Sequence, residues 1–263
     1  PTMGALHPGH LSLVDRSLGG TDITVVSIFV NPKQFSEDED FSTYPRTLDQ
    51  DLELLNGLGV DVVFTPGVED IYNEDVRAFS FVDSFSKTLE GRARPHFFPG
   101  VINVVSRLFD IVAPDFAYFG KKDAQQLLLI EKLVDLGDFS IKVVRCDTVR
   151  EESGLAMSSR NKYLSAEAKD VACCIYRSLV YANNLLLRGE MGVDKIKRGM
   201  NQIINKNKKM NIDYISIVCL QNLVEVAGVV SGPVLISIAA VLDGVRLIDN
   251  VFYDSMSRPM STL

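Results

Sequence analysis

The sequence predicts an α/β fold, in which a parallel sheet domain with helices on both faces precedes a smaller α+β domain. Apolar, β-branched segments alternate with helix-like segments over the first 145 residues, as in a parallel sheet with crossover helices. Two helical segments and then three short strands follow residue 161. Hydrophobic residues make up 46% of the 263, enough for a sizeable core. We therefore expect two domains, 1–160 and 161–263.

In the first domain we expect strands at 23–30, 60–65, 116–119 and 141–145. Helices are expected at 47–58, 101–112 and 127–134, from apolar residues that recur on one side. Thr47 and Gln50 have the spacing of a capping box. The segment 1–10 has the character of a loop and helix start that follow a strand, so we expect a first central strand upstream of it.

In the second domain a long helix is expected at 165–188, with Ser165 as N-cap and Gly189 just past its end. A second helix at 193–207 and strands at 214–218, 234–241 and 246–252 complete the domain. Helices followed by short strands joined at turns are typical of a small α+β domain.

Composition narrows the class of protein. The net charge of −7 and the pI near 5.1 disfavour binding to a nucleic-acid backbone. None of the four cysteines forms a CxxC pair, which favours free thiols in a reducing compartment. No segment approaches the ~20 apolar residues that span a bilayer. We expect a cytoplasmic protein with neither nucleic acid nor membrane as partner.

Two histidines, His7 and His10, stand three residues apart where a helix is expected to begin at His10. A helix N-terminus exposes unpaired N–H groups and the positive end of the dipole, which favours a phosphate. Gly9 permits close approach of a ligand, and both imidazoles could donate to phosphoryl oxygens. A surface loop with incidental histidines and a zinc pair are the alternatives, but no cluster completes a zinc site.

Three further segments suit ligand binding, although each also fits an ordinary loop. The segment 154–161 combines a glycine, two serines and Arg160, as a pyrophosphate clamp requires. The segment 120–126 follows the strand 116–119, at the edge where parallel sheets bind ligands. Asn31 and Gln34 follow the strand 23–30 and offer neutral amides for hydroxyl and carboxylate groups. Neither a P-loop nor a GxGxxG fingerprint is present.

Together these segments closely resemble the pantothenate synthetase (pantoate–β-alanine ligase) family, in its order and spacing and over nearly the whole chain. The segments that carry the resemblance are PTMGALHPGH at 1–10, FVNPKQF at 29–35, YPRT at 44–47, LEGRARP at 89–95, FGKKDAQQ at 119–126, REESGLAMSSRN at 150–161 and RLIDN at 246–250.

The resemblance implies a nucleotidyltransferase-type, Rossmann-like domain of the HUP type, a smaller C-terminal lid domain and a homodimer. It also implies a two-step reaction. ATP and pantoate would give pantoyl adenylate and pyrophosphate, and β-alanine would then displace AMP to give pantothenate, with Mg²⁺ assisting.

The same resemblance implies roles for particular residues. His10 would be the acid/base residue and His7 its partner at the phosphates. The phosphates need positive charge, which His7, His10, Lys122 and Arg160 can supply. Gln34 and Gln126 would hold pantoate, with Asn31 beside them, and Asp51 would neighbour Mg²⁺. The ATP site would comprise Met3, Gly4, Ala5, Leu6, His7, Pro8, Gly9, His10, Gly120, Lys121, Lys122, Asp123, Val149, Met157, Ser158, Ser159 and Arg160.

The chain also departs from the family pattern. A His-Phe pair usually precedes the glycine at 100, but here His96 stands one place early and Pro99 replaces a common polar residue, so we assign His96 no role. Ser153 and Lys121 replace residues that are often acidic. The rival functions are another nucleotidyltransferase with the same histidine motif, a class I aminoacyl-tRNA synthetase, and a non-catalytic nucleotide-binding protein. The two glutamines favour a small carboxylic acid as substrate.

Overall fold

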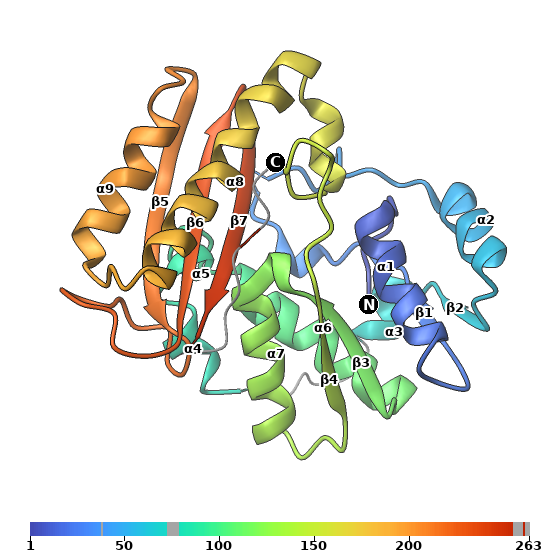
Figure 1. Ribbon diagram of the computed structural model, residues 1–263. Helices are drawn as coiled ribbons and strands as arrows, with labels where there is room; N and C mark the ends of the chain where they lie inside the picture. The colour runs from blue at the N-terminus through green and yellow to red at the C-terminus, as the bar shows by residue number, and fades with distance from the viewer. Residues whose placement is uncertain (38, 73–78, 255–259, 261–263) are drawn as a thin grey trace. The chain divides into compact units, whose positions relative to one another are not determined.

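The computed structural model describes residues 1–37, 39–72, 79–254 and 260 (Figure 1). The chain forms two compact units, Pro1–Thr148 and Val149–Leu263. The boundary between these units lies before the segment 149–161, whereas the sequence led us to expect a boundary at 160. The reason is that this segment is tied to the second unit, for example through the Arg150–Asp249 ion pair.

The first unit contains two pairs of parallel strands. Strand β1 (Val25–Ser27) pairs with β2 (Val62–Phe64), and β3 (Phe116–Gly120) pairs with β4 (Lys142–Cys146). The parallel direction was expected. Within the described residues, however, the two pairs form separate two-stranded sheets and not one continuous sheet.

Strand β1 is shorter than the apolar run 23–30 predicts. The reason lies in the hydrogen bonds that follow it: the amide of Ile28 donates to Phe64 at 2.9 Å, and that of Phe29 donates to Thr2 at 3.0 Å. A parallel bridge between Thr2 and Ile28 accompanies them. The end of β1 is thereby attached to the first residues of the chain, which lead into the candidate site.

Seven α-helices and two 3₁₀ turns are described in the first unit. They are α1 (Pro8–Leu18), α2 (Leu48–Leu58), α3 (Val68–Ile71), α4 (Val82–Phe85), α5 (Leu89–Ala93), α6 (Phe97–Val112), α7 (Ala124–Leu136), η1 (Pro32–Gln34) and η2 (Lys121–Asp123). The expected capping box of α2 is wrong: Thr47 precedes the helix, but its side chain accepts no bond from the helix amides. Its hydroxyl donates to Asp51 Oδ2 at 3.3 Å instead.

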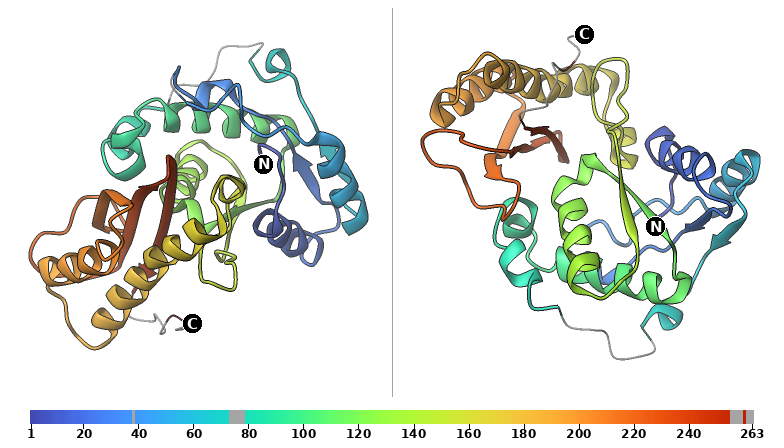
Figure 2. Two further views of the ribbon diagram at one scale, coloured as in Figure 1. Left: turned by 90° about the horizontal axis from the view of Figure 1, so that it is seen from above. Right: turned by 60° about the horizontal axis from the view of Figure 1, so that its bottom comes forward.

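The second unit is an antiparallel sheet with helices on one face (Figures 1 and 2). Its elements are η3 (Ser159–Tyr163), α8 (Ala166–Leu187), α9 (Val193–Ile204), β5 (Met210–Cys219), β6 (Val234–Leu242) and β7 (Val245–Tyr253), with strand order β5-β6-β7. The expected ends of α8 are confirmed. Ser165 Oγ accepts from the amide of Ala168 at 3.1 Å, and Gly189 has φ +84°.

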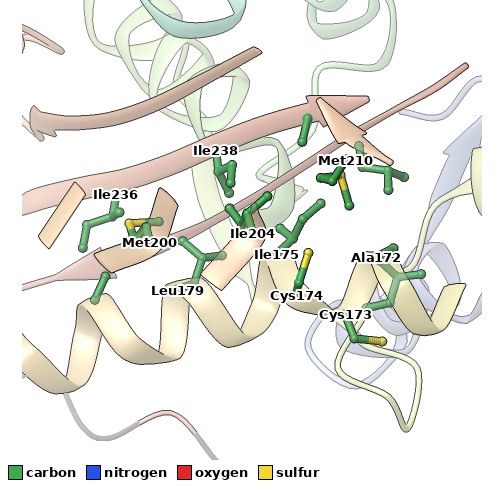
Figure 3. Close-up of a cluster of buried hydrophobic side chains, with 14 of the residues drawn as sticks. Ala172, Cys173, Cys174, Ile175, Leu179, Met200, Ile204, Met210, Ile236 and Ile238 are labelled. Carbon is green, nitrogen blue, oxygen red and sulfur yellow. The ribbon is translucent and has the colours of Figure 1, made fainter. Parts of the chain in front are cut away.

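The core of the second unit lies between α8, α9 and the central strand β6 (Figure 3). Leu179, Met200, Ile236 and Ile238 are each 0% exposed there. Of the helices that are described, none is long and apolar enough to cross a membrane.

Candidate active site

Helix α1 begins at Pro8, and His7 is its N-cap. The expectation that the helix opens at His10 is therefore corrected, because Pro8 has the fixed φ suited to a first helical position. The Nδ1 atom of His7 accepts from the amide of Gly9 at 3.1 Å. A neutral imidazole with an accepting Nδ1 carries its proton on Nε2, so Nε2–H is the group that His7 can donate.

His10 lies in the first turn of α1 with its ring centroid 4.0 Å from that of His7. Burial, and then the neighbouring His7 and Lys122, lower the pKa of His10 to about 3. Burial and Lys122 also lower the pKa of His7. Both imidazoles are therefore neutral donors at pH 7, whereas the sequence led us to expect positive charge from them. His10 Nδ1 is buried and has no hydrogen-bond partner within the described part of the chain.

The loop before α1 has an unusual backbone that Asp51 stabilises. Gly4 and Ala5 both have positive φ, +79° and +51°, a conformation that disfavours a side chain at Ala5. Asp51 is 2% exposed and accepts from the amides of Ala5 at 2.9 Å and Leu6 at 2.8 Å. We did not predict this anchor. Its sequence signal is that Asp51 and the fully buried Leu55 are four residues apart on one face of α2.

Lys122 and Asp123 lie in η2, directly after β3. The charges of both residues shift the pKa of His7 and of His10. Residues from the expected segments 120–126 and 7–10 therefore interact electrostatically. Lys122 Nζ lies 3.5 Å from Asp123 Oδ1. Lys121 differs from its neighbour, since its Nζ lies 2.5 Å from the carboxylate of the exposed Asp147.

Asn31 and Gln34 form a hydrogen-bonded pair, but only Gln34 keeps a side-chain group available for substrate. Asn31 is 0% exposed and its Nδ2 donates to Gln34 Oε1 at 2.8 Å and to the carbonyl of Gly100 at 3.0 Å. Its Oδ1 accepts from Tyr72 Oη at 2.6 Å and from the amide of Lys33 at 3.2 Å. The sequence led us to expect Asn31 to contact the substrate. Such a contact would require one of these hydrogen bonds to break. The bond to Oε1 leaves the Nε2 amide as the donor that Gln34 can offer.

A second support for Gln34 was missed in the sequence. Arg94 binds Glu39 through two nitrogens, at 2.6 and 2.8 Å, and Arg94 Nη2 also donates to the carbonyl of Gln34 at 3.1 Å. Burial opposes ionisation of Glu39, but Arg94 outweighs it and brings the pKa of Glu39 below its ordinary value. His96 Nε2 lies 3.5 Å from Glu39 Oε2, so the displaced histidine belongs to this cluster.

The two adjacent glutamines at the start of α7 have different roles. Gln125 is buried, and its Nε2 donates to the carbonyls of Phe85 at 2.7 Å and Thr88 at 3.0 Å. Its Oε1 accepts from the amide of Glu90 at 2.9 Å. Gln125 therefore holds the segment before α5, whereas Gln126 is partly exposed and was the glutamine expected to contact substrate.

The remaining expected residues, Val149 and 157–160, all lie in the second unit. The amide of Met157 donates to the carbonyl of Val149 at 2.9 Å. Ser158 caps η3, since its Oγ accepts from the amide of Arg160 at 3.3 Å. These residues thus form a continuous, hydrogen-bonded segment at the start of the unit.

The described residues contain no group of three or more His, Cys, Asp or Glu side chains that could hold a metal ion. Both oxygens of Asp51, the residue expected near Mg²⁺, already accept backbone hydrogen bonds. A cation would therefore have to obtain most of its ligands from phosphates and water, as Mg²⁺ commonly does beside a nucleotide.

Comparison with known proteins is consistent with this site. A family profile described as pantoate–β-alanine ligase matches residues 1–252. Pantothenate synthetase of Caldicellulosiruptor saccharolyticus is 46% identical over 95% of this chain and 89% of its own length. The enzyme of Staphylococcus epidermidis is 45% identical, over 95% and 87%.

Two solved structures are similar as well. Pantothenate synthetase from Thermus thermophilus superposes with a TM-score of 0.88 at 41% identity, covering 95% of this chain and 91% of that one. A pantoate–β-alanine ligase from Francisella tularensis, described as complexed with β,γ ATP and β-alanine, gives 0.77 at 34% identity, covering 99% and 90%.

The fold and the site define an ATP-dependent ligase of the α/β class. Its parallel strands precede an antiparallel sheet, as the similar structures lead one to expect. The chain belongs to the pantoate–β-alanine ligase family, and it joins pantoate to β-alanine with ATP.

Proposed function

We propose that the chain makes pantothenate in two chemical steps, by way of pantoyl adenylate. The observation that carries this proposal is the histidine pair at the N-terminus of α1. Two neutral imidazoles 4.0 Å apart, one with a buried Nδ1 that lacks a partner, lie within the electrostatic reach of Lys122. Neutral donors, the positive end of the α1 dipole and one cation together suit a phosphate chain.

In the first step a carboxylate oxygen of pantoate attacks the α-phosphorus of ATP. The new C–O–P bond forms as the bond to the β-phosphate breaks, and pyrophosphate leaves with the electron pair. Gln34 and Gln126 suit this step, because neutral amides orient a carboxylate without the strong ion pair that would weaken it as a nucleophile. Lys122 offsets charge that builds on the phosphoryl oxygens.

In the second step the uncharged amine of β-alanine attacks the carbonyl carbon of the adenylate. The C–N bond forms, AMP leaves with the former carboxylate oxygen, and the amine loses one proton. His10 suits proton transfer, because an imidazole that is neutral at pH 7 can accept a proton when a phosphate lies beside it. His7 would donate from Nε2 to the phosphates, since its Nδ1 is bonded to Gly9.

The other parts of the nucleotide site belong to the same proposal. Residues 3–6 and 8–9 would line the phosphate site, and Gly120, Lys121 and Asp123 would contact the nucleotide. Val149, Met157, Ser158, Ser159 and Arg160 would contribute from the second unit. Asn31 would act through Gln34, which its hydrogen bond orients.

Three further features are proposed with the function. Mg²⁺ would bind through the phosphates of ATP and neutralise their charge, with Asp51 shaping the loop beside it and not donating a ligand. The enzyme would act as a homodimer in the cytoplasm. ATP, pantoate and β-alanine would be its small-molecule partners, as the description of the Francisella complex supports for two of them.

Pyrophosphate release tests the proposal. With ATP, Mg²⁺ and pantoate alone, the enzyme should release about one pyrophosphate per active site, and β-alanine should then start turnover to AMP and pantothenate. His10→Ala should slow the first release by at least ~10²-fold, the loss typical of one phosphate-stabilising donor. Release that requires β-alanine from the outset would argue against a separate adenylate.

A further inference from the structure

The segment with Ser158, Ser159 and Arg160 is preceded by a small hairpin. Arg150 and Ala156 form an antiparallel bridge, and the amide of Met157 donates to the carbonyl of Val149 at 2.9 Å. The turn is closed by the amide of Gly154, which donates to Glu151 at 2.8 Å, and Gly154 has φ +88°. The hairpin is only a few residues long, so it needs other contacts to hold one position.

Arg150 supplies the first of these contacts. Its Nη1 and Nη2 bind the two carboxylate oxygens of Asp249 at 2.5 and 3.0 Å, across 99 residues of sequence. Nη1 also donates to the carbonyl of Gly154 at 3.1 Å, and the guanidinium lies 4.3 Å from the ring centroid of Tyr176 on α8. Asp249 is 3% exposed and belongs to β7. One side chain thus joins the hairpin turn to the sheet and to the long helix.

Asn161 supplies a second contact, from the other end of the segment. It is 4% exposed, and its Nδ2 donates to Glu151 Oε1 at 2.9 Å and to the carbonyl of Ala156 at 3.0 Å. The backbone N–H of Asn161 donates to the carbonyl of Ser158 at 3.0 Å, within η3. Residues 158–160 are therefore held between Asn161 on one side and the Arg150-anchored hairpin on the other.

We propose that Arg150 and Asp249 are positioning residues for adenylation, whose ion pair fixes the hairpin that presents Ser158, Ser159 and Arg160. The inference rests on the proposed role of 158–160 at the phosphates of ATP. The geometry favours positioning over simple stabilisation, because the same guanidinium donates hydrogen bonds to Gly154 in the hairpin turn and to Asp249 in the sheet. Bidentate pairing sets direction as well as distance.

Steady-state and single-turnover kinetics of Asp249→Asn test the inference. We expect kcat/KM for ATP to fall by ~10²-fold, since misplacement of a contacting group by about 1 Å has effects of this size. KM for pantoate should stay within twofold, because the pantoate residues lie in the other unit. Rates are expressed per active site, titrated by the pyrophosphate burst, so that loss of folded enzyme does not mimic the effect.

The chain offers a matched control in the same strand. Arg246 of β7 binds Asp213 of β5 through two nitrogens, at 3.0 and 2.7 Å, so this pair joins two strands of the sheet. Asp213→Asn should leave kcat/KM for ATP within twofold. An equal loss in both variants would show that any break in the strand ion pairs impairs the enzyme, and would overturn the inference.

The double variant Arg150→Met with Asp249→Leu separates positioning from stability. Replacing a buried ion pair by apolar residues of similar volume often preserves stability. We expect this variant to regain thermal stability relative to Asp249→Asn while kcat/KM for ATP remains low. Recovery of both to the level of the parent enzyme would contradict a positioning role.

Arg160→Ala distinguishes failure of the inference from failure of the proposed function. Normal pyrophosphate release in Arg160→Ala would remove the 158–160 segment from adenylation, and the inference with it. A large loss in Arg160→Ala together with normal kinetics in Asp249→Asn would refute the inference alone.

Discussion

Acid should destabilise this enzyme through His10 in particular. The folded-state pKa of His10 is lowered from 6.5 to about 3, so the unfolded chain binds a proton on this residue that the folded chain does not. Stability from the neutral form is fully present above the unfolded pKa and is lost as the pH falls below it. Linkage gives about 1.4 kcal/mol per pH unit, and therefore about 2 kcal/mol lost between pH 7 and pH 5.

Urea unfolding followed by circular dichroism measures this loss. The parent and His10→Gln are compared at pH 7 and pH 5, so that contributions from groups remote from His10 cancel in the difference. The free energy of unfolding of the parent should fall by about 2 kcal/mol more than that of the variant. Proton NMR adds a direct check, since the ring signal of His10 should not titrate between pH 8 and pH 4.5.

Equal acid sensitivity in the parent and in His10→Gln would refute the reasoning. An NMR titration of His10 near pH 6.5 would do so as well. Either result would mean that burial does not keep this imidazole neutral. The proposed role of His10 as a proton acceptor at pH 7 would then lack its physical support.

Three substitutions test the supports around the site. Asn31→Ala leaves buried groups unpaired, at about 1–3 kcal/mol each, and should raise KM for pantoate about tenfold with less effect on KM for ATP. Asp51→Ala should do the reverse, raising KM for ATP because two backbone amides of the loop before α1 lose their acceptor. Gly100→Ala places a Cβ 2.2 Å from the carbonyl oxygen of Lys33 and should cost about 1–3 kcal/mol, whereas Gly57→Ala meets nothing within 4 Å and should not destabilise. Thermal unfolding and the two KM values check all three, and an Asp51→Ala enzyme with unchanged KM for ATP would contradict the anchor.

Local sequence signals predicted the elements well where the element depends on its own residues. Helix α8 begins after Ser165, whose hydroxyl caps it, and ends before Gly189, as the capping pattern indicates. Strand β1 was predicted too long, because the apolar run continues past the point where its hydrogen bonds turn to Thr2. Apolar residues at 28–30 indicate that this segment is buried. They do not indicate which carbonyl each backbone amide will bind, because that depends on the tertiary structure.

The candidate site shows the same division. The histidine motif and the loop after β3 could be identified from residue types and spacing, since each lies at the end of one element. The support of Gln34 by Arg94 could not, because this contact joins residues that are 60 apart in the sequence. The Arg150–Asp249 pair spans 99 residues, and neither residue alone differs from an ordinary surface charge in the sequence.

The central claim is that this enzyme activates pantoate by adenylating its carboxylate. Pantoate labelled with ¹⁸O in both carboxylate oxygens, incubated with ATP, Mg²⁺, β-alanine and the enzyme, tests it most directly. Attack on the α-phosphorus followed by attack of the amine at the carbonyl carbon should leave one ¹⁸O in AMP and one in pantothenate, as mass spectrometry would detect. Label in orthophosphate with formation of ADP, and none in AMP, would contradict the account, because it would mean activation through an acyl phosphate.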